Sequence, residues 1–185
     1  PDLVKADGER MLVVAGGGEG YADSELLLVR YNSDGTPDSA FNGTGIVRTE
    51  VDGSHFAGAR QVRLQSDGKI VVMGARYSGS SDIVVARYSS AGALDGAFGG
   101  GDGITIVDSG AYDSPNDFLI QPNGMLVLAA SYDFDFAVVR LGSDGSLDTG
   151  FDGDGIVTSN TITEGKAVVQ RPDGKLVVAG VSSPT

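Results

Sequence analysis

The chain has 185 residues, a formal net charge of −12 and no cysteine. Its acidic balance argues against a nucleic-acid partner, because such binding rests on neutralising phosphates with Lys and Arg, and the lack of Cys excludes disulfides and thiolate chemistry. No apolar run approaches the ~20 residues that a membrane-spanning helix needs, so we expect no membrane insertion.

Short apolar runs rich in β-branched residues recur along the chain and predict strands. Near the start we expect strands over 12–15, 25–31, 45–51 and 59–65. Branched side chains suit a pleated surface, and the Gly, Asp, Asn and Pro residues that bound the runs favour turns. Glycine accounts for 29 of the 185 residues without a collagen period, which also indicates many turns. No amphipathic helical pattern competes with these strands, so the chain is predicted to be all-β.

One phrase occurs three times and sets the architecture. It reads RYNSDGTPDSAFNGTGI from residue 30, RYSSAGALDGAFGGGDGI from residue 87 and RLGSDGSLDTGFDGDGI from residue 140. A second phrase, which is QSDGKIVVMG in the copy that ends at Gly74, recurs between them and carries Asp-Gly or Asn-Gly pairs that favour two-residue hairpins. A period of about 50 to 60 residues is typical of propellers and solenoids.

These repeats predict a β-propeller-like array of four-stranded antiparallel blades. The approximate repeats are 11–68, 69–124 and 125–174, followed by a partial strand at 175–181. Closed propellers usually have four to eight blades. Three repeats therefore predict either a fragment of a longer array or a homo-oligomer that closes the propeller, for which a six-bladed ring of two chains is one arrangement.

Each copy of the first phrase carries an arginine, an aspartate eight residues later and a phenylalanine shortly after. The three sets are Arg30, Asp38 and Phe41; Arg87, Asp95 and Phe98; and Arg140, Asp148 and Phe151. This spacing predicts an ion pair or an aspartate cap across the turn, which is a structural clip rather than a catalytic pair. The ring is predicted to anchor the loop against the packed sheets rather than to stack on a ligand.

The same turns carry the candidate metal ligands. The stretches NSDGTPD and FDGDG place oxygen atoms at alternate positions, as Ca²⁺ prefers. The candidates are Asn32, Asp34, Asp38, Asp152 and Asp154. Neither stretch has the closing bidentate Glu of a complete calcium loop, and Ala91 and Ala93 occupy the corresponding places in the second copy. Turn chemistry is therefore the preferred interpretation, with Ca²⁺ as the alternative, and no other cofactor is expected.

Aromatic and acidic side chains mix in two further segments, 108–117 and 132–136. Tyr and Asp in loops can hold a sugar by stacking and hydrogen bonding, or they can serve protein contacts. The candidate ligand-binding residues are Tyr112, Tyr132, Asp133 and Asp135. Alternation at period two favours a different interpretation, a strand in which Phe134 and Phe136 share one face and the aspartates face solvent.

We expect no catalytic residues. His55 is the only histidine and has no GxSxG nucleophile elbow beside it. Without Cys or a second His, the usual triads and zinc sites cannot be assembled in one chain. Asp152 and Asp154 could serve as acid and base on a glycoside, but the repeated turn accounts for them.

The QPDGK-like turns that lead into VVAG, followed by VxRYxxDGxLDxxFGxxG, resemble the delta-60 repeat family. The resemblance extends from Lys5 to Gly180, with departures at Ala91, Leu141 and Ala130. It implies β-propeller-type repeats, found in bacterial secreted or surface proteins, and it carries no catalytic residues over to this chain.

We therefore expect a noncatalytic propeller-type scaffold or binding module of a bacterial secreted or cell-surface protein, which acts in adhesion or protein binding and contacts a protein or a surface glycan. The alternative is a carbohydrate-binding module or a glycan-active enzyme that uses the loops of the propeller face. The extracellular or cell-surface location follows from the resemblance. Because the sequence starts at Pro1 without a signal-like segment, we expect a mature product or a piece of a longer chain.

Overall fold

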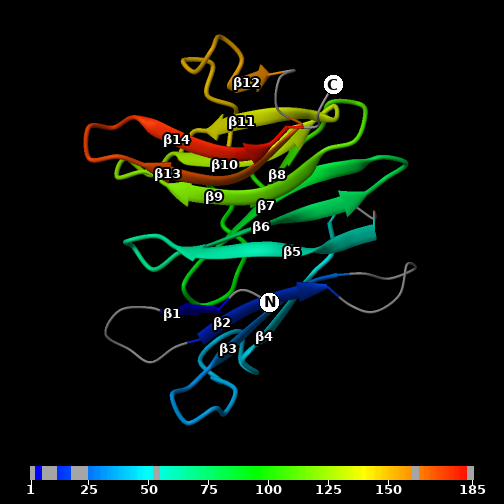
Figure 1. The fold of residues 1–185 in the computed structure, drawn as a ribbon. Helices are drawn as coiled ribbons and strands as arrows, with labels where there is room; N and C mark the ends of the chain where they lie inside the picture. The colour runs from blue at the N-terminus through cyan, green and yellow to red at the C-terminus, as the bar shows by residue number, and fades with distance from the viewer. Residues whose placement is uncertain (1–2, 6–11, 18–24, 52–54, 160–162, 183–185) are drawn as a thin grey trace.

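The computed structural model describes residues 3–5, 12–17, 25–51, 55–159 and 163–182, with side chains from residue 25 onward except at 55–57. Within these ranges all regular structure is β-strand, as the sequence predicts. Three four-stranded antiparallel sheets follow one another, and a two-stranded sheet comes last (Figure 1). The described ranges hold no helix long and apolar enough to cross a membrane.

Each sheet is a meander in which consecutive strands are paired. The first contains β1 (Leu3–Lys5), β2 (Leu12–Gly17), β3 (Leu26–Tyr31) and β4 (Ile46–Thr49). The second contains β5 (His55–Leu64), β6 (Ile70–Tyr77), β7 (Ser81–Tyr88) and β8 (Ile104–Val107). The third contains β9 (Ser114–Ile120), β10 (Leu126–Tyr132), β11 (Asp135–Leu141) and β12 (Ile156–Ser159). The last contains β13 (Glu164–Gln170) and β14 (Leu176–Val181).

The sheets begin one strand earlier than the sequence repeats do. β5, β9 and β13 each close a sequence repeat, yet each is the first strand of the following sheet. The reason is the Asp-Gly or Asn-Gly turn after each of them, which folds the strand back onto the next one as an antiparallel hairpin. The partial strand expected at 175–181 is accordingly β14, paired with β13.

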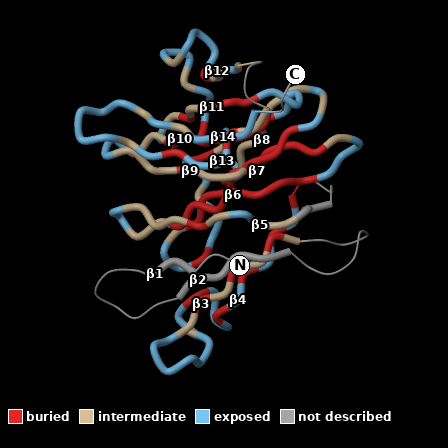
Figure 2. The backbone as a smooth tube through the Cα atoms, viewed as in Figure 1, coloured by how far each residue is buried: buried red, intermediate tan, exposed pale blue. Residues whose placement is uncertain are grey.

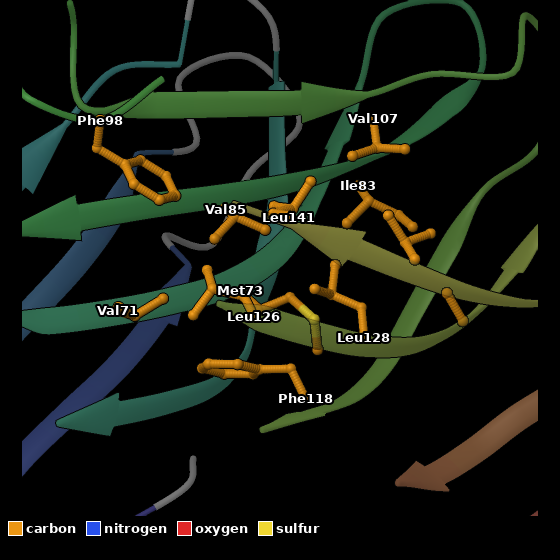
Figure 3. Close-up of a cluster of buried hydrophobic side chains, with 12 residues drawn as sticks. Val71, Met73, Ile83, Val85, Phe98, Val107, Phe118, Leu126, Leu128 and Leu141 are labelled. Carbon is orange, nitrogen blue, oxygen red and sulfur yellow. The ribbon is translucent and has the colours of Figure 1, made fainter. Parts of the chain in front are cut away.

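The sheets stack face to face, and side chains from neighbouring sheets form the core. In β6, Ile70 and Val72 pack toward the first sheet, while Val71 and Met73 pack toward the third, where they meet Phe118 (Figure 3). Because successive side chains of a strand point to opposite faces, a sheet covered on both faces needs an unbroken apolar run. Buried residues accordingly follow the strands of the central sheets, and the turns are exposed (Figure 2).

The first strands of successive sheets lie against one another along one side of the stack. β5 contacts β1, β9 contacts β5, and β13 contacts β9. In each sheet the later strands follow in order away from this side. Such a radial order, with one edge of every sheet turned toward a common side, is the arrangement of propeller blades.

The repeated phenylalanines anchor one sheet to the next. Phe41 and Phe98 are fully buried, which confirms the predicted core role for both. Each ring lies against the turn glycine of the following sheet. A Cβ atom at Gly92 would lie 2.9 Å from a ring carbon of Phe41, and one at Gly145 would lie 2.8 Å from a ring carbon of Phe98. Phe151 is half-buried, and it packs against a cluster of side chains from the third and last sheets.

We predict that Gly92→Ala and Gly145→Ala destabilise the fold more than Gly79→Ala does. All three glycines have φ between +87° and +94°, so each alanine bears about 1–2 kcal/mol for a left-handed backbone. Gly79 has no atom within 4 Å of its Cβ position, whereas the other two add overpacking of ~1–3 kcal/mol. Urea unfolding followed by circular dichroism measures the difference, and equal losses in all three variants would contradict the packing described for the rings.

Candidate functional site

The turns at one end of the stacked sheets have a repeated sequence, whereas the connections at the other end do not. Because each sheet is a meander, the turns 32–45, 89–103 and 142–155 lie at one end, which we call the latch end. The opposite end, which we call the loop end, carries the β6–β7 turn, the β8–β9 connection at 108–113 and the β10–β11 turn. The latch end holds the repeated phrase, while the loop end has a different sequence in each sheet.

At the latch end each repeated arginine holds the aspartate and the phenylalanine of its own turn. The Nε atoms of Arg30, Arg87 and Arg140 donate to the aspartate Oδ2 atoms of their turns at 2.8, 2.7 and 2.6 Å. The guanidinium carbons lie 4.7, 4.6 and 4.4 Å from the ring centroids of the corresponding phenylalanines, within the range of a cation–π contact. The predicted clip is confirmed. We call each set of arginine, aspartate and phenylalanine a latch.

The first two latches also cross to the next sheet. Arg30 Nη1 donates to the carbonyl of Ser90 at 2.5 Å, and Arg87 Nη1 donates to the carbonyl of Ser143. Beside each of these two latches a backbone amide also donates to the next sheet. The Asn42 amide donates to the Ala91 carbonyl at 3.0 Å, and the Gly99 amide donates to the Asp144 carbonyl at 2.9 Å. The latch is therefore a structural joint between sheets.

The candidate calcium ligands belong to this structural end. Asp34 Oδ1 accepts from the Thr36 hydroxyl at 2.6 Å and from its amide at 2.9 Å, and these bonds lower the pKa of Asp34. Asp38 belongs to the first latch, Asn32 donates to the Thr36 hydroxyl, and Asp154 Oδ1 accepts from a backbone amide two residues on. Asp152 has a left-handed backbone with φ of 53°. The carboxylates of Asp34, Asp38 and Asp154 thus accept hydrogen bonds within their turns.

The candidate ligand-binding residues meet at the loop end. The rings of Tyr112 and Phe134 stack with centroids 5.4 Å apart and planes at 17°, and the Phe134 amide donates to the Tyr112 carbonyl at 3.3 Å. The Tyr132 hydroxyl donates to the Asp108 carbonyl at 3.4 Å. Asp133 and Asp135 flank Phe134 and are exposed. The segments 108–117 and 132–136, which the sequence analysis singled out separately, therefore form one surface.

The continuous strand expected through 132–136 is wrong. β10 ends at Tyr132 and β11 begins at Asp135, with Asp133 and Phe134 as a two-residue turn at φ of 52° and 64°. Phe136 is buried, whereas the Phe134 side chain is 65% exposed. A hairpin turn of this kind requires left-handed residues, which non-glycine side chains adopt at a cost of about 1–2 kcal/mol each. Contacts from the neighbouring loop hold the turn in place.

Those contacts centre on Asp113, which the sequence did not single out. Asp113 is fully buried and accepts from the Ser109 hydroxyl at 2.7 Å, the Ser109 amide at 2.8 Å and the Asp133 amide at 3.0 Å. Its carboxylate also lies within 4.8 Å of those of Asp82 and Asp108. Asp108 and Asp113 belong to the β8–β9 connection, whereas Asp82 belongs to β7 of the second sheet, so the fold is needed to show that Asp82 lies near the other two.

The acidic surroundings affect the nearest phenol. Burial, together with repulsion from Asp113 and Asp108, raises the pKa of Tyr132 above its ordinary value. Asp82 is held by Arg76, whose Nε donates to Asp82 Oδ2 at 2.9 Å. The loop end therefore combines two buried, hydrogen-bonded carboxylates, Asp82 and Asp113, with the exposed Asp108 and an exposed aromatic pair. The side chain of His55 and the Asp7-Gly8 turn lie outside the described residues.

The radial four-stranded sheets and their latches define a β-propeller domain. A family model described as a domain of unknown function (DUF5122) β-propeller matches residues 10–41, 65–98 and 121–151, so the chain belongs to this family. Each matched stretch ends at a latch phenylalanine. The propeller-repeat class expected from the sequence is confirmed, whereas the delta-60 family stays a resemblance of the motifs.

A solved structure supports the fold. The chain is similar to a crystal structure of a protein of unknown function from Bacteroides caccae, with a TM-score of 0.55 and 12% sequence identity, over 92% of this chain and 50% of that one. This chain thus spans about half the length of that protein. No curated protein matches it.

We predict that the second latch makes the stability of the fold depend on pH in the acid range. The Ala97 amide, followed by Lys69 and Arg87, lowers the pKa of Asp95 in spite of its burial. Because the folded pKa lies below the unfolded value, the stabilisation is complete above pH ~4 and is lost as the pH falls through the folded pKa. Asp95→Asn should therefore lower the melting temperature at pH 7 and flatten its fall below pH ~4. Asp135→Asn, which removes an exposed charge, is the control, and a parental melting profile for Asp95→Asn would refute the latch's role.

Proposed function

We propose that this β-propeller domain is a noncatalytic binding module of a bacterial secreted or cell-surface protein, and that its loop end binds a partner protein. The observation that carries the proposal is the stacked Tyr112–Phe134 pair, two residues that are 45% and 65% exposed. Large exposed aromatic residues are enriched at the centres of protein interfaces. The bacterial surface location draws on the resemblance of the repeats to the delta-60 family.

Hydrogen bonds order the loops that carry the aromatic pair, and this order favours binding. The fully buried Asp113 receives the amide of Asp133, and the Tyr112 carbonyl receives the amide of Phe134. Hydrogen bonds of the adjoining backbone thus fix the two loops that carry the rings. A surface that is already ordered loses less conformational entropy on binding, so this arrangement suits recognition.

The charge around the rings favours a basic partner. Asp108, Asp133 and Asp135 are exposed beside the pair, and the whole chain has a net charge of −12. A Lys or Arg side chain of a partner could pair with these carboxylates and lie on an aromatic face, where a cation–π contact contributes about 0.5–2 kcal/mol. Such binding weakens as salt screens the charges.

The buried carboxylates support a noncatalytic role. Asp82 is paired with Arg76, and Asp113 accepts three hydrogen bonds from Ser109 and Asp133. A general acid or base needs a free path to substrate. Asp82 is instead engaged with Arg76 of its own hairpin, and Asp113 joins the β8–β9 connection to the β10–β11 turn.

A second candidate is a carbohydrate-binding module or a glycan-active enzyme at the same surface. The observation that favours it is the exposed aromatic pair beside acidic oxygens, because sugars stack on aromatic faces and donate hydroxyl hydrogen bonds to carboxylates. A glycan ligand and a basic protein ligand would use the same rings, so one set of variants tests both.

We predict saturable binding to basic peptides on an array of basic, neutral and acidic peptides, and about tenfold weaker binding for Phe134→Ala, equivalent to ~1.4 kcal/mol. Leu147→Ala is the matched control, since Leu147 is an exposed apolar side chain at the latch end and its loss should leave binding unchanged. A glycan array and a hydrolysis assay run in parallel. Glycan binding without turnover selects the second candidate as a binding module, turnover overturns the noncatalytic role, and binding to neither array overturns both.

A further inference from the structure

The third latch is built like the first two, but in the described part of the chain Arg140 makes no hydrogen bond to the following sheet. Arg140 pairs with Asp148 and lies over the Phe151 ring. Arg30 and Arg87 each also donate to a carbonyl of the next sheet, and within the described ranges no equivalent carbonyl lies against Arg140. Asp152 repeats the left-handed backbone of Asn42, whose amide crosses to the next sheet.

The first sheet carries a turn of the kind that accepts a latch from a preceding sheet. The turn Ser33-Asp34-Gly35 corresponds in sequence to Ser90-Ala91-Gly92 and Ser143-Asp144-Gly145, which receive the first and second latches. Gly92 and Gly145 meet a phenylalanine ring, whereas Gly35 has no atom within 4 Å of its Cβ position and a similar φ of +86°. This turn is an unfilled acceptor for a latch.

The last sheet shows the same incompleteness. Among the described strands β14 pairs with β13 alone, whereas its counterpart β2 lies between β1 and β3. The two strands begin with the same five residues, LVVAG. On the face turned away from the third sheet, Val169, Val177 and Val181 are 58%, 49% and 48% exposed. Edge strands with an apolar face are sites where a further strand adds.

We propose that a second copy of this chain completes the propeller by strand exchange. β3 and β4 of the second copy pair with β14, which takes the place of β2, and the second copy's Ser33–Gly35 turn then receives the third latch. The third latch and the Ser33–Gly35 turn match, because the first and second latches each contact a turn of this kind in the next sheet. The new interface would therefore repeat a contact that the chain already makes twice.

The exchange replaces the β2–β3 pairing by a β14–β3 pairing, and β1 and β2 leave the first sheet. β14 offers β3 the same five residues in the same register as β2, so strand pairing is conserved. The gain comes from the third latch and from covering the exposed valines. Exchange of an equivalent element between protomers is a known route to a dimer, and β14 is equivalent to β2 over these five residues. Each copy would contribute its second and third sheets together with parts of two shared sheets, which makes about six blades, within the usual range for closed propellers.

The first test is the oligomeric state of the chain by sedimentation equilibrium over a range of concentrations. We expect a dimer, and Phe151→Ala should raise its dissociation constant at least tenfold. Phe134→Ala removes an exposed phenylalanine from the loop end and should leave dimerisation unchanged. Gly35→Ala, which places a methyl group where the partner's ring would lie, should weaken the dimer, whereas Gly79→Ala has a similar φ and should not.

The second test locates the contact, using the absence of native cysteine. Gly16 pairs with Leu27 in β2–β3, and Gly180 occupies the place of Gly16 in β14. A chain carrying both Gly180→Cys and Leu27→Cys should therefore form disulfide-linked dimers on mild oxidation, since opposed Cα atoms of antiparallel strands lie about 4.5–5.5 Å apart. The two single variants should not.

Three results would overturn the proposal. The first is a monomer at every concentration, and the second is a dimer insensitive to both Phe151→Ala and Gly35→Ala. The third is cross-linking of the single-cysteine variants as efficient as that of the double variant, which indicates a symmetric contact instead of strand exchange. Circular dichroism of each variant shows whether it has folded, and the cysteine pair tests the contact without removing either latch group.

Discussion

The arginine of each latch is the constraint on which the stacked sheets depend. One guanidinium holds an aspartate of its own turn, lies over a phenylalanine, and in two of three cases donates to a carbonyl of the next sheet. Arginine suits this task because its five donors are fixed in one plane and its face stacks on aromatic rings. Apolar burial supplies most of the attraction between sheets, while the latch fixes how one sheet is set against the next.

This division assigns different roles to the two ends of the molecule. The latch end repeats because every joint needs the same donor, ring and turn glycine. The loop end is free of that demand, and there the Asp113 carboxylate organises the neighbouring loops and presents Tyr112 and Phe134 to solvent. A scaffold whose joints lie at one end can vary the other without losing its fold, which is the usual relation between a repeated architecture and the sites it carries.

The sequence predicted the features that depend on short-range pattern. β-branched runs located the strands, and the eight-residue spacing from Arg87 to Asp95 indicated the ion pair. A periodic sequence has no intrinsic start, so the sheet boundaries depended on hairpin turns that join one repeat to the next. The turn at Phe134 and the meeting of Asp82 with Asp113 were missed, because side chains from separate sheets determine them and period-two alternation mimics a strand there.

A double-mutant cycle on Arg87 and Asp95 tests the central claim most directly. Urea unfolding of the parent, Arg87→Gln, Asp95→Asn and the double variant gives the coupling free energy between the two side chains, which are 6% and 14% exposed. The latch predicts a favourable coupling of about 1–3 kcal/mol, with the double variant less destabilised than the sum of the single ones. Additive losses would contradict it, since they would mean that Asp95 does not hold the arginine that donates to the next sheet.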